Sequence, residues 1–357
     1  MKTSLIVSFA HALTVTTLCG ILTCGGARGA KFIEWYTERC SGGNATACEE
    51  AIDFAMTTHP QLVDGIMPCC QGLQIDCSTG TLMYNVSHYD FSLVKPFLEA
   101  GKSVRVTIQG SGGGAACCRS AENCTMLENK EKLASQLLEI ALKFNLTGFT
   151  GDWEWGEGEF YWASWNKTMS YIASVLKPHG IGIGNSVASW CASYEQCTPD
   201  GGSSDPCCCP AYRNQPWADV LTDMGSYSIS NAKPKWFPLK DCPPDPNNDP
   251  SIIQYCGFEG FTMNFLHSPV ATVYTDRAPQ ISPALWIGDC FPNGTTKQGW
   301  TQDKLRSFLM FLDTQNIQRI GLWCMTNESD PIGFPCPVES CPWIYEELLR
   351  WKTRRSI

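Results

Sequence analysis

Two carboxyl groups separated by one residue stand among tryptophans in the stretch GDWEW. Asp152 and Glu154 flank Trp153, and Trp155 follows them. Alternate side chains of a strand share a face, so Asp152 and Glu154 are expected on one face together with Thr150. Neighbouring carboxylates repel each other when both are ionised, and one of them then keeps its proton to a higher pH. This pattern indicates general-acid chemistry, in which a carboxylic acid protonates a leaving oxygen.

The elements that must position this pair follow from short apolar runs that alternate with helix-length segments. Strands are expected at 31–36, 62–70, 103–110, 148–154, 181–187, 218–228, 282–289 and 319–325. Helices are expected at 48–59, 89–102, 127–145, 161–180, 301–316 and 343–351. Eight such strands predict a (β/α)₈ TIM barrel. The alternative is an open doubly wound sheet, which the absence of a Gly-x-Gly-x-x-Gly turn after an early strand disfavours.

The barrel gives the acidic pair a definite place. Glu154 falls at the C-terminal rim of the fourth strand, where barrel enzymes carry their chemistry, and Asp152 lies one layer deeper. Two insertions, 190–217 and 229–281, are rich in proline, cysteine, asparagine and glycine. Both follow strands, so these Cys-rich loops are expected on the same face, where they would wall the pocket.

The stretch GFTGDWEW resembles the fourth-strand signature of the family 18 glycoside hydrolases, the chitinase and endo-β-N-acetylglucosaminidase group. That signature reads Asp-Gly-x-Asp-x-Asp-x-Glu and begins at Thr147 of this chain. Its glycine, last aspartate and glutamate match, whereas its first two aspartates are replaced by Thr147 and Thr150. The resemblance implies a substrate-assisted retaining mechanism on a β-linked N-acetylglucosamine polymer or glycan. Glu154 would be the general acid, and Asp152 would hold the N-acetyl group.

Other positions resemble the family more loosely. The Ser-x-Gly-Gly end of the family's third strand has a counterpart in QGSGGG, which begins at Gln109. Met224 and Tyr227 stand where the sixth strand of the family carries a methionine and a tyrosine that steadies the acetamido group, one residue further apart than usual. Trp323 matches the tryptophan that floors the family's pocket. Trp286 is interpreted as a sugar platform or a core residue.

Two alternatives stay open. Asp289 ends the seventh predicted strand, so Glu154 and Asp289 would suit a two-carboxylate retaining glycosidase, if their carboxyl groups lay about 5–5.5 Å apart. The two threonine replacements, Thr147 and Thr150, favour a catalytically inactive barrel lectin that binds glycans through its aromatic side chains. In the family that this stretch resembles, the position of Thr150 carries an aspartate, which shares charge with the aspartate at the position of Asp152. A threonine hydroxyl cannot take up a proton in its place.

Composition limits the partners and the compartment. The chain has 357 residues, is 43% hydrophobic and carries a net charge of −9, which disfavours nucleic acid and anionic membranes as partners. Residues 1–30 read as a secretory signal peptide cut between Cys24 and Lys31, with an uncut signal anchor as the alternative. No other stretch is apolar enough to span a bilayer. The domain expected after the signal is one barrel, 31–357.

Cysteines and sequons point to the same compartment. The 21 cysteines favour disulfides over zinc ligation, and the odd number remaining after the signal region leaves one thiol free or bonded to another chain. Glycosylation sequons stand at Asn44, Asn85, Asn123, Asn145, Asn166, Asn293 and Asn327. We therefore expect a secreted glycoprotein with a carbohydrate substrate and without a cofactor or metal.

Overall fold

Parallel strands dominate the part of the chain that the computed structural model describes, namely residues 31–37, 45–68, 72–110, 117–120, 122–153, 162–187, 215–223, 280–286, 302–314, 316–323 and 341–354. The strands are β1 (Phe32–Thr37), β2 (Gly65–Pro68), β3 (Leu73–Asp76), β4 (Thr81–Leu82), β5 (Ser103–Gly110), β6 (Gly148–Gly151), β7 (Gly182–Val187), β8 (Val220–Asp223), β9 (Ile281–Trp286) and β10 (Arg319–Trp323). The α-helices are α1 (Ala45–Thr57), α2 (Lys95–Glu99), α3 (Thr125–Glu128), α4 (Lys130–Phe144), α5 (Trp162–Leu176), α8 (Gln302–Thr314) and α9 (Trp343–Thr353). Short 3₁₀ turns are η1 (Val86–His88), η2 (Ser92–Val94) and η5 (Lys177–His179).

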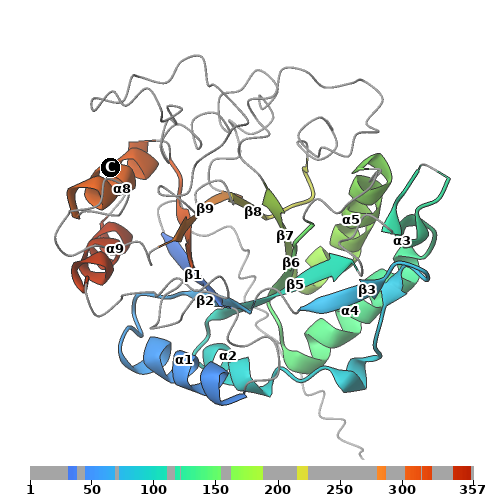
Figure 1. Ribbon diagram of the computed structural model, residues 1–357, viewed down its shortest axis with the longest axis horizontal. Coiled ribbons are helices and arrows are strands. Elements are labelled where there is room, and N and C mark those ends of the chain that lie inside the picture. Colours follow the sequence, from blue (N-terminus) through green and yellow to red (C-terminus); the bar gives the residue numbers. More distant parts are fainter. Residues whose placement is uncertain are drawn as a thin grey trace, which may run out of the picture.

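Eight of these strands close into a parallel barrel surrounded by helices (Figure 1). The ring runs β1, β2, β5, β6, β7, β8, β9 and β10, and β10 pairs back onto β1. The predicted TIM barrel is therefore confirmed and the open sheet is excluded. Each of the eight predicted strand ranges overlaps one strand of the ring.

Several predicted boundaries differ from the structure by a few residues, and two of the differences have local reasons. The strand expected at 62–70 begins only at Gly65, because the Asp64 side chain turns back to accept a hydrogen bond from the Ile33 amide at 2.9 Å. The helix expected at 89–102 is α-helical only over Lys95–Glu99. Asp90 accepts the Ser92 amide at 2.9 Å and forms a turn that precedes it.

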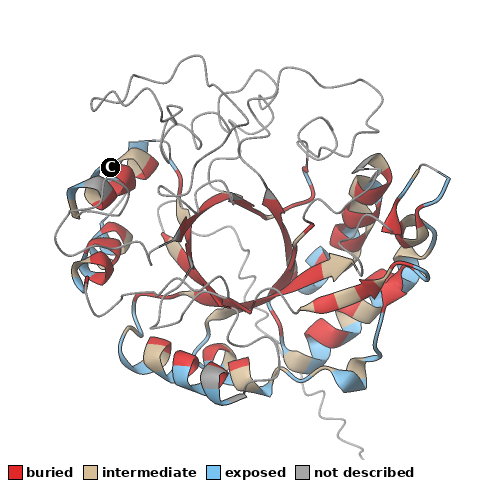
Figure 2. Cartoon of the chain, viewed as in Figure 1, coloured by how far each residue is buried: buried red, intermediate tan, exposed pale blue. Residues whose placement is uncertain are grey.

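The helices bury the apolar faces that the sequence predicted. Leu133, Leu137, Ile140 and Ala141 of α4 are all buried. Phe144 remains partly buried and meets Phe91 edge to face, with 5.1 Å between the ring centroids. Figure 2 shows the consequence for the whole molecule: the barrel strands are buried, and the helices are buried toward the barrel and exposed on their outer side.

A hairpin that the sequence analysis missed extends the sheet outside the barrel. β3 pairs in parallel with the end of β5, from Leu73↔Ile108 to Ile75↔Gly110, and β4 pairs antiparallel with β3. The turn between these two strands is held by the Cys77–Cys117 disulfide. Its neighbour Cys118 bonds instead to Cys124. The disulfide prediction is thus confirmed for these pairs, and Cys48 and Cys341 are also disulfide-bonded.

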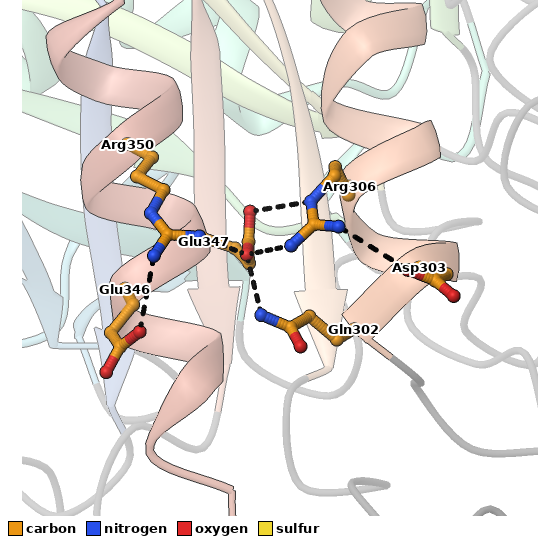
Figure 3. A network of polar contacts seen from close by, with 6 residues as sticks. All are labelled: Gln302, Asp303, Arg306, Glu346, Glu347 and Arg350. Carbon is orange, nitrogen blue, oxygen red and sulfur yellow. Dashed lines mark hydrogen bonds and ion pairs between the residues drawn. The ribbon is translucent and has the colours of Figure 1, made fainter.

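A polar network fastens the last two helices to each other (Figure 3). Glu347 of α9 is buried, and its carboxylate accepts hydrogen bonds from Arg306 of α8 at 2.6 and 3.3 Å. Gln302 and Arg350 each donate a further bond to it at 2.8 Å. Because one carboxylate binds side chains from both helices, the network fixes how α9 packs on α8 beside the strands that close the barrel.

The same hydrogen-bonding arrangement recurs at the N-terminal ends of alternate barrel strands. A short polar side chain just before each of β2, β6 and β8 accepts the backbone amide of the preceding barrel strand. Asp64 accepts from Ile33, Thr147 from Val104 and Asp219 from Ile183, each at 2.9 Å. These side chains satisfy strand amides that would otherwise lack partners near the barrel floor.

Three predicted glycosylation sites are exposed: Asn85, Asn123 and Asn145. Asn145 lies at the surface, where it caps α4 in a left-handed conformation. Asn166 is partly buried, and its side-chain oxygen accepts the Trp217 indole N–H at 2.5 Å. Asn44, Asn293, Asn327, the predicted signal and nearly all of both insertions lie outside the described residues. None of the helices described has the length and apolar character needed to cross a membrane.

Candidate active site

The acidic stretch begins at the C-terminal end of β6, the fourth strand of the barrel. The Asp152 amide donates to the Ile108 carbonyl at 3.0 Å, so the pairing with β5 continues one residue past the strand. Trp153 is buried and packs edge to face on Trp165 of α5, with ring centroids 6.4 Å apart. Trp153 therefore points outward to the helices, as the alternation predicted.

Thr150 lies on the opposite, inward side of the same strand. It is fully buried, and a Cβ added at Gly184 of the next strand would lie 3.4 Å from the Thr150 hydroxyl and 2.6 Å from the Arg105 guanidinium. Arg105 in turn reaches Glu34 across the interior. Thr150 thus lies within the barrel, and the pleat carries Asp152 to the same side one layer nearer the rim.

One hydrogen bond anchors the Asp152 carboxylate. The Gln109 side-chain amide donates to Asp152 Oδ2 at 2.7 Å. Burial raises the pKa of the Asp152 carboxyl, and the bond from Gln109 lowers it in part. Among the described residues, the causes of this shift are desolvation and one neutral donor, and no charged side chain contributes to it.

The barrel interior below Asp152 is polar. The Arg105 guanidinium donates two hydrogen bonds to the Glu34 carboxylate, at 2.8 and 2.5 Å, so these charges neutralise each other. The Tyr36 hydroxyl lies 3.2 Å from the Thr222 hydroxyl and 3.5 Å from that of Ser282. Burial, followed by the nearby Glu34 charge, raises the pKa of Tyr36 to about 12, so its phenol stays neutral.

The two threonines that depart from the family signature have different surroundings. Thr147 lies at the N-terminal end of β6, where its hydroxyl bonds the backbone of Val104. Thr147 is five residues from Asp152, about 16 Å at roughly 3.3 Å per residue, which is too far for a contact with the Asp152 carboxyl. Thr150 lies only two residues before Asp152 and on the same side of the strand, so it belongs to the surroundings of the Asp152 carboxyl. Its hydroxyl, like that of Thr107 opposite it on β5, is buried without a hydrogen-bond partner in the described part of the chain.

The structure brings some predicted pocket positions together by their backbones. Trp323 of β10 is in register with Trp286 of β9 on one side and with Tyr36 of β1 on the other. All three positions lie toward the C-terminal ends of parallel strands, the end at which Asp152 follows β6. The remaining predicted site residues lie outside the described residues: Glu154, Trp155, Met224, Tyr227 and Asp289.

Sequence reasoning missed Gln109, Glu34 and Arg105. A usable signal exists on β5, where buried apolar residues at 104, 106 and 108 alternate with Arg105, Thr107 and Gln109. A parallel strand that is covered on both faces is usually apolar on both of them. Its polar positions therefore mark the inward face and predict a polar barrel interior.

Comparison with known proteins supports the architecture. No protein-family model matches the sequence, and no curated protein matches it. Solved structures do resemble it. A chitinase from Chromobacterium violaceum superposes with a TM-score of 0.55 at 12% sequence identity, over 91% of this chain and 100% of that one. Group IV chitinase of Ostrinia furnacalis gives 0.55 at 11%, over 91% of this chain and 100% of that one.

A fungal endo-beta-N-acetylglucosaminidase from glycosyl hydrolase family 18 is also similar, with a TM-score of 0.51 at 13% identity. That likeness covers 90% of this chain and 98% of the fungal chain. Identities this low speak for the fold and not for the chemistry. The chain thus shares its (β/α)₈ barrel fold with glycoside hydrolases of the chitinase and endo-β-N-acetylglucosaminidase kind.

Proposed function

We propose that the protein is a secreted glycoside hydrolase that cleaves β-linked N-acetylglucosamine polymers or glycans by a substrate-assisted retaining mechanism. One observation carries the proposal: a desolvated carboxyl, Asp152, follows the fourth strand of a chitinase-like barrel on the inward side and is anchored by Gln109. Glu154 comes two residues later, at the position where the resemblance puts the general acid. The fold and this placement support the same reaction class.

The reaction uses the substrate's own acetamido group as nucleophile. The Glu154 carboxyl gives its proton to the glycosidic oxygen as the bond from that oxygen to C1 breaks. The acetamido carbonyl oxygen bonds to C1 from the opposite face and forms an oxazolinium ion, whose N–H donates to Asp152. The Glu154 carboxylate then takes a proton from water while the water oxygen attacks C1. The ring reopens, and the product keeps its original anomeric configuration.

Asp152 must be ionised to accept that N–H in the intermediate. Burial raises its pKa, so the acid limb of the pH profile lies above the ordinary aspartate value of about 3.9. Activity is expected to fall as the pH drops through the raised pKa, because a protonated Asp152 offers one acceptor fewer. Tyr227 would steady the acetamido group, while Met224, Trp155, Trp286 and Trp323 would contact the sugar.

Secretion is part of the proposal. Residues 1–30 would be removed as a signal peptide, and exposed Asn85, Asn123 and Asn145 are the most accessible of the described sequons. The Cys77–Cys117 and Cys118–Cys124 disulfides support an oxidising compartment. Expression in secretory cells, with N-terminal sequencing and glycosidase digestion of the released protein, tests both points.

Thr150 favours a second candidate function, a glycan-binding barrel without turnover. The buried hydroxyl stands where the resemblance expects a carboxyl beside Asp152. Glu154→Gln separates the two functions when binding and turnover of N-acetylglucosamine oligomers are measured together. An enzyme loses turnover by about a hundredfold or more and keeps its binding. A binding protein shows no turnover in the wild type, and its affinity changes little.

A further inference from the structure

Within the described part of the chain, Gln109 is the one side chain that donates a hydrogen bond to the Asp152 carboxylate, and its own position is firmly held. Its backbone lies in β5 between two strands, in register with Gln74 of β3 on one side and next to β6 on the other. The carbonyl of the preceding residue, Ile108, accepts the Asp152 amide at 3.0 Å. Backbone and side chain of β5 thus hold Asp152 at two adjacent points.

The bond has a definite polarity. An ionised carboxylate has only acceptors, so the 2.7 Å contact with Asp152 Oδ2 makes the Gln109 nitrogen the donor. A neutral amide donor favours the charged carboxylate and itself neither gains nor loses a proton near neutral pH. It occupies one oxygen of Asp152 and fixes the plane of the carboxylate, and the other oxygen is then oriented for a second donor.

Among the described residues of β5 and β6, no titratable side chain lies in the layer directly below Asp152. Thr150 and Thr107 lie side by side there as buried hydroxyls. Below them, Arg105 is already bound to Glu34 by two hydrogen bonds. A carboxyl at position 150 could share a proton with Asp152, whereas these groups cannot.

We infer that Gln109 is a positioning residue that replaces the missing carboxyl at position 150, by holding Asp152 ionised and oriented toward the substrate N–H. The inference rests on the proposed function. It assigns the control of Asp152 to an uncharged side chain on a different strand. Burial raises the pKa of Asp152, and among the described side chains the hydrogen bond from Gln109 opposes this rise, so its loss should move the acid limb of the pH profile upward.

The test compares Gln109→Leu, Gln109→Glu and Gln74→Leu with the wild type in the full secreted chain. Gln74 is the glutamine in register with Gln109 on the outer hairpin strand, so Gln74→Leu is the matched control. The readout is kcat/KM against pH for an aryl β-glycoside of N-acetylglucosamine or its dimer. Thermal unfolding of each variant confirms folding.

Gln109→Leu is expected to move the acid limb upward by about one pH unit, which lowers kcat/KM about tenfold on that limb. Gln109→Glu is expected to move it further, since two adjacent carboxyl groups retain a shared proton to higher pH. Gln74→Leu should follow the wild-type profile. A Gln109→Leu profile that overlays the wild type, or a loss of kcat/KM by one factor at every pH, would overturn the inference while leaving the proposed function intact.

Titration of the Asp152 carboxyl by ¹³C NMR, assigned by Asp152→Asn, gives a readout that does not depend on turnover. Its midpoint is expected to rise in Gln109→Leu and to stay constant in Gln74→Leu. If the wild type is inactive but the Asp152 midpoint still rises in Gln109→Leu, the proposed function is refuted while the Gln109–Asp152 coupling is retained. An unchanged midpoint would refute the coupling itself.

Discussion

The Arg105 guanidinium and the Glu34 carboxylate form a doubly hydrogen-bonded ion pair inside the barrel, with N···O distances of 2.8 and 2.5 Å. Both residues are almost fully buried. The pair links β5 to β1 across the interior, and its two opposite charges compensate each other beneath Asp152. The pair therefore belongs to the packed barrel interior that lies below the proposed site.

Removal of one partner should leave an unpaired buried charge. Glu34→Gln and Arg105→Met are each expected to lower the free energy of unfolding by about 3–5 kcal/mol. The Glu34→Gln/Arg105→Met double variant should lose clearly less than the sum of the single changes, because it buries no charge. Urea unfolding of the three variants checks this, and strictly additive losses would show that the two residues do not act as a pair.

Arg105 also explains why position 184 is glycine. A Cβ at Gly184 would lie 2.6 Å from the Arg105 guanidinium and 2.8 Å from the Val220 carbonyl, whereas at Gly182 the nearest atom is 3.5 Å away. Gly184→Ala is therefore expected to destabilise by about 1–3 kcal/mol. Gly182→Ala, two residues earlier on β7, serves as the control and should be close to neutral. Equal unfolding midpoints for the two variants would contradict this packing.

Glu347 gives a pH-dependent prediction. The hydrogen bond from Arg306 is the largest cause that lowers the pKa of Glu347. A lowered folded-state pKa stabilises the protein above the unfolded pKa of about 4.3, and the contribution disappears as the pH falls through the folded pKa. Arg306 and Arg350 are 41% and 57% exposed, so screening limits the effect of Glu347→Gln at pH 7 to about 1–2 kcal/mol.

Thermal unfolding from pH 7 down to pH 3 measures this effect. The difference in unfolding temperature between the wild type and Glu347→Gln should become smaller as the pH falls from 7 to 3. Glu346→Gln is the control, because Glu346 is 62% exposed and only faces Arg350 at 3.6 Å. A deficit of Glu347→Gln that stays constant with pH, or a similar deficit in Glu346→Gln, would rule out the charge on Glu347 as its source.

The two threonines of the altered signature should respond differently to aspartate. Thr147 accepts a backbone amide of the neighbouring strand, as Asp64 and Asp219 do. Thr147→Asp should therefore change the free energy of unfolding by no more than about 1 kcal/mol and kcat/KM by no more than about twofold. Thr150→Asp adds a second carboxyl one layer below Asp152, and should shift the acid limb of the kcat/KM profile because the two share a proton. Kinetics of both variants from pH 4 to 8 check this, and a shifted limb in Thr147→Asp would contradict the assignment.

The barrel was predictable because its strands are short apolar runs, such as Ser103–Gly110 and Arg319–Trp323, separated by segments of helix length. The Leu73–Leu82 hairpin was not, since its strands have four and two residues and carry too little pattern to be recognised. The Asp152 position followed from the period of the strand. The sequence could not predict which distant residues contact each other. Glu34 and Arg105, for example, are 71 residues apart, and only the closed barrel makes them neighbours.

Gln109 was missed for a chemical reason. A glutamine carries no titratable group, so it attracts attention only when a structure shows what its amide binds. The alternation on β5 indicated that Gln109 points inward with Arg105 and Thr107. Gln109 and Asp152 are 43 positions apart in the sequence, so no local sequence pattern could predict their contact.

Hydrolysis of paired aryl β-glycosides that differ only in a 2-acetamido or a 2-hydroxyl group tests the central claim most directly, with Asp152→Asn beside the wild type. The account predicts that the wild type cleaves the 2-acetamido substrate, leaves the 2-hydroxyl substrate intact, and loses at least about a hundredfold in kcat/KM on Asp152→Asn. Cleavage of both substrates at similar rates, or an unchanged Asp152→Asn variant, would contradict it.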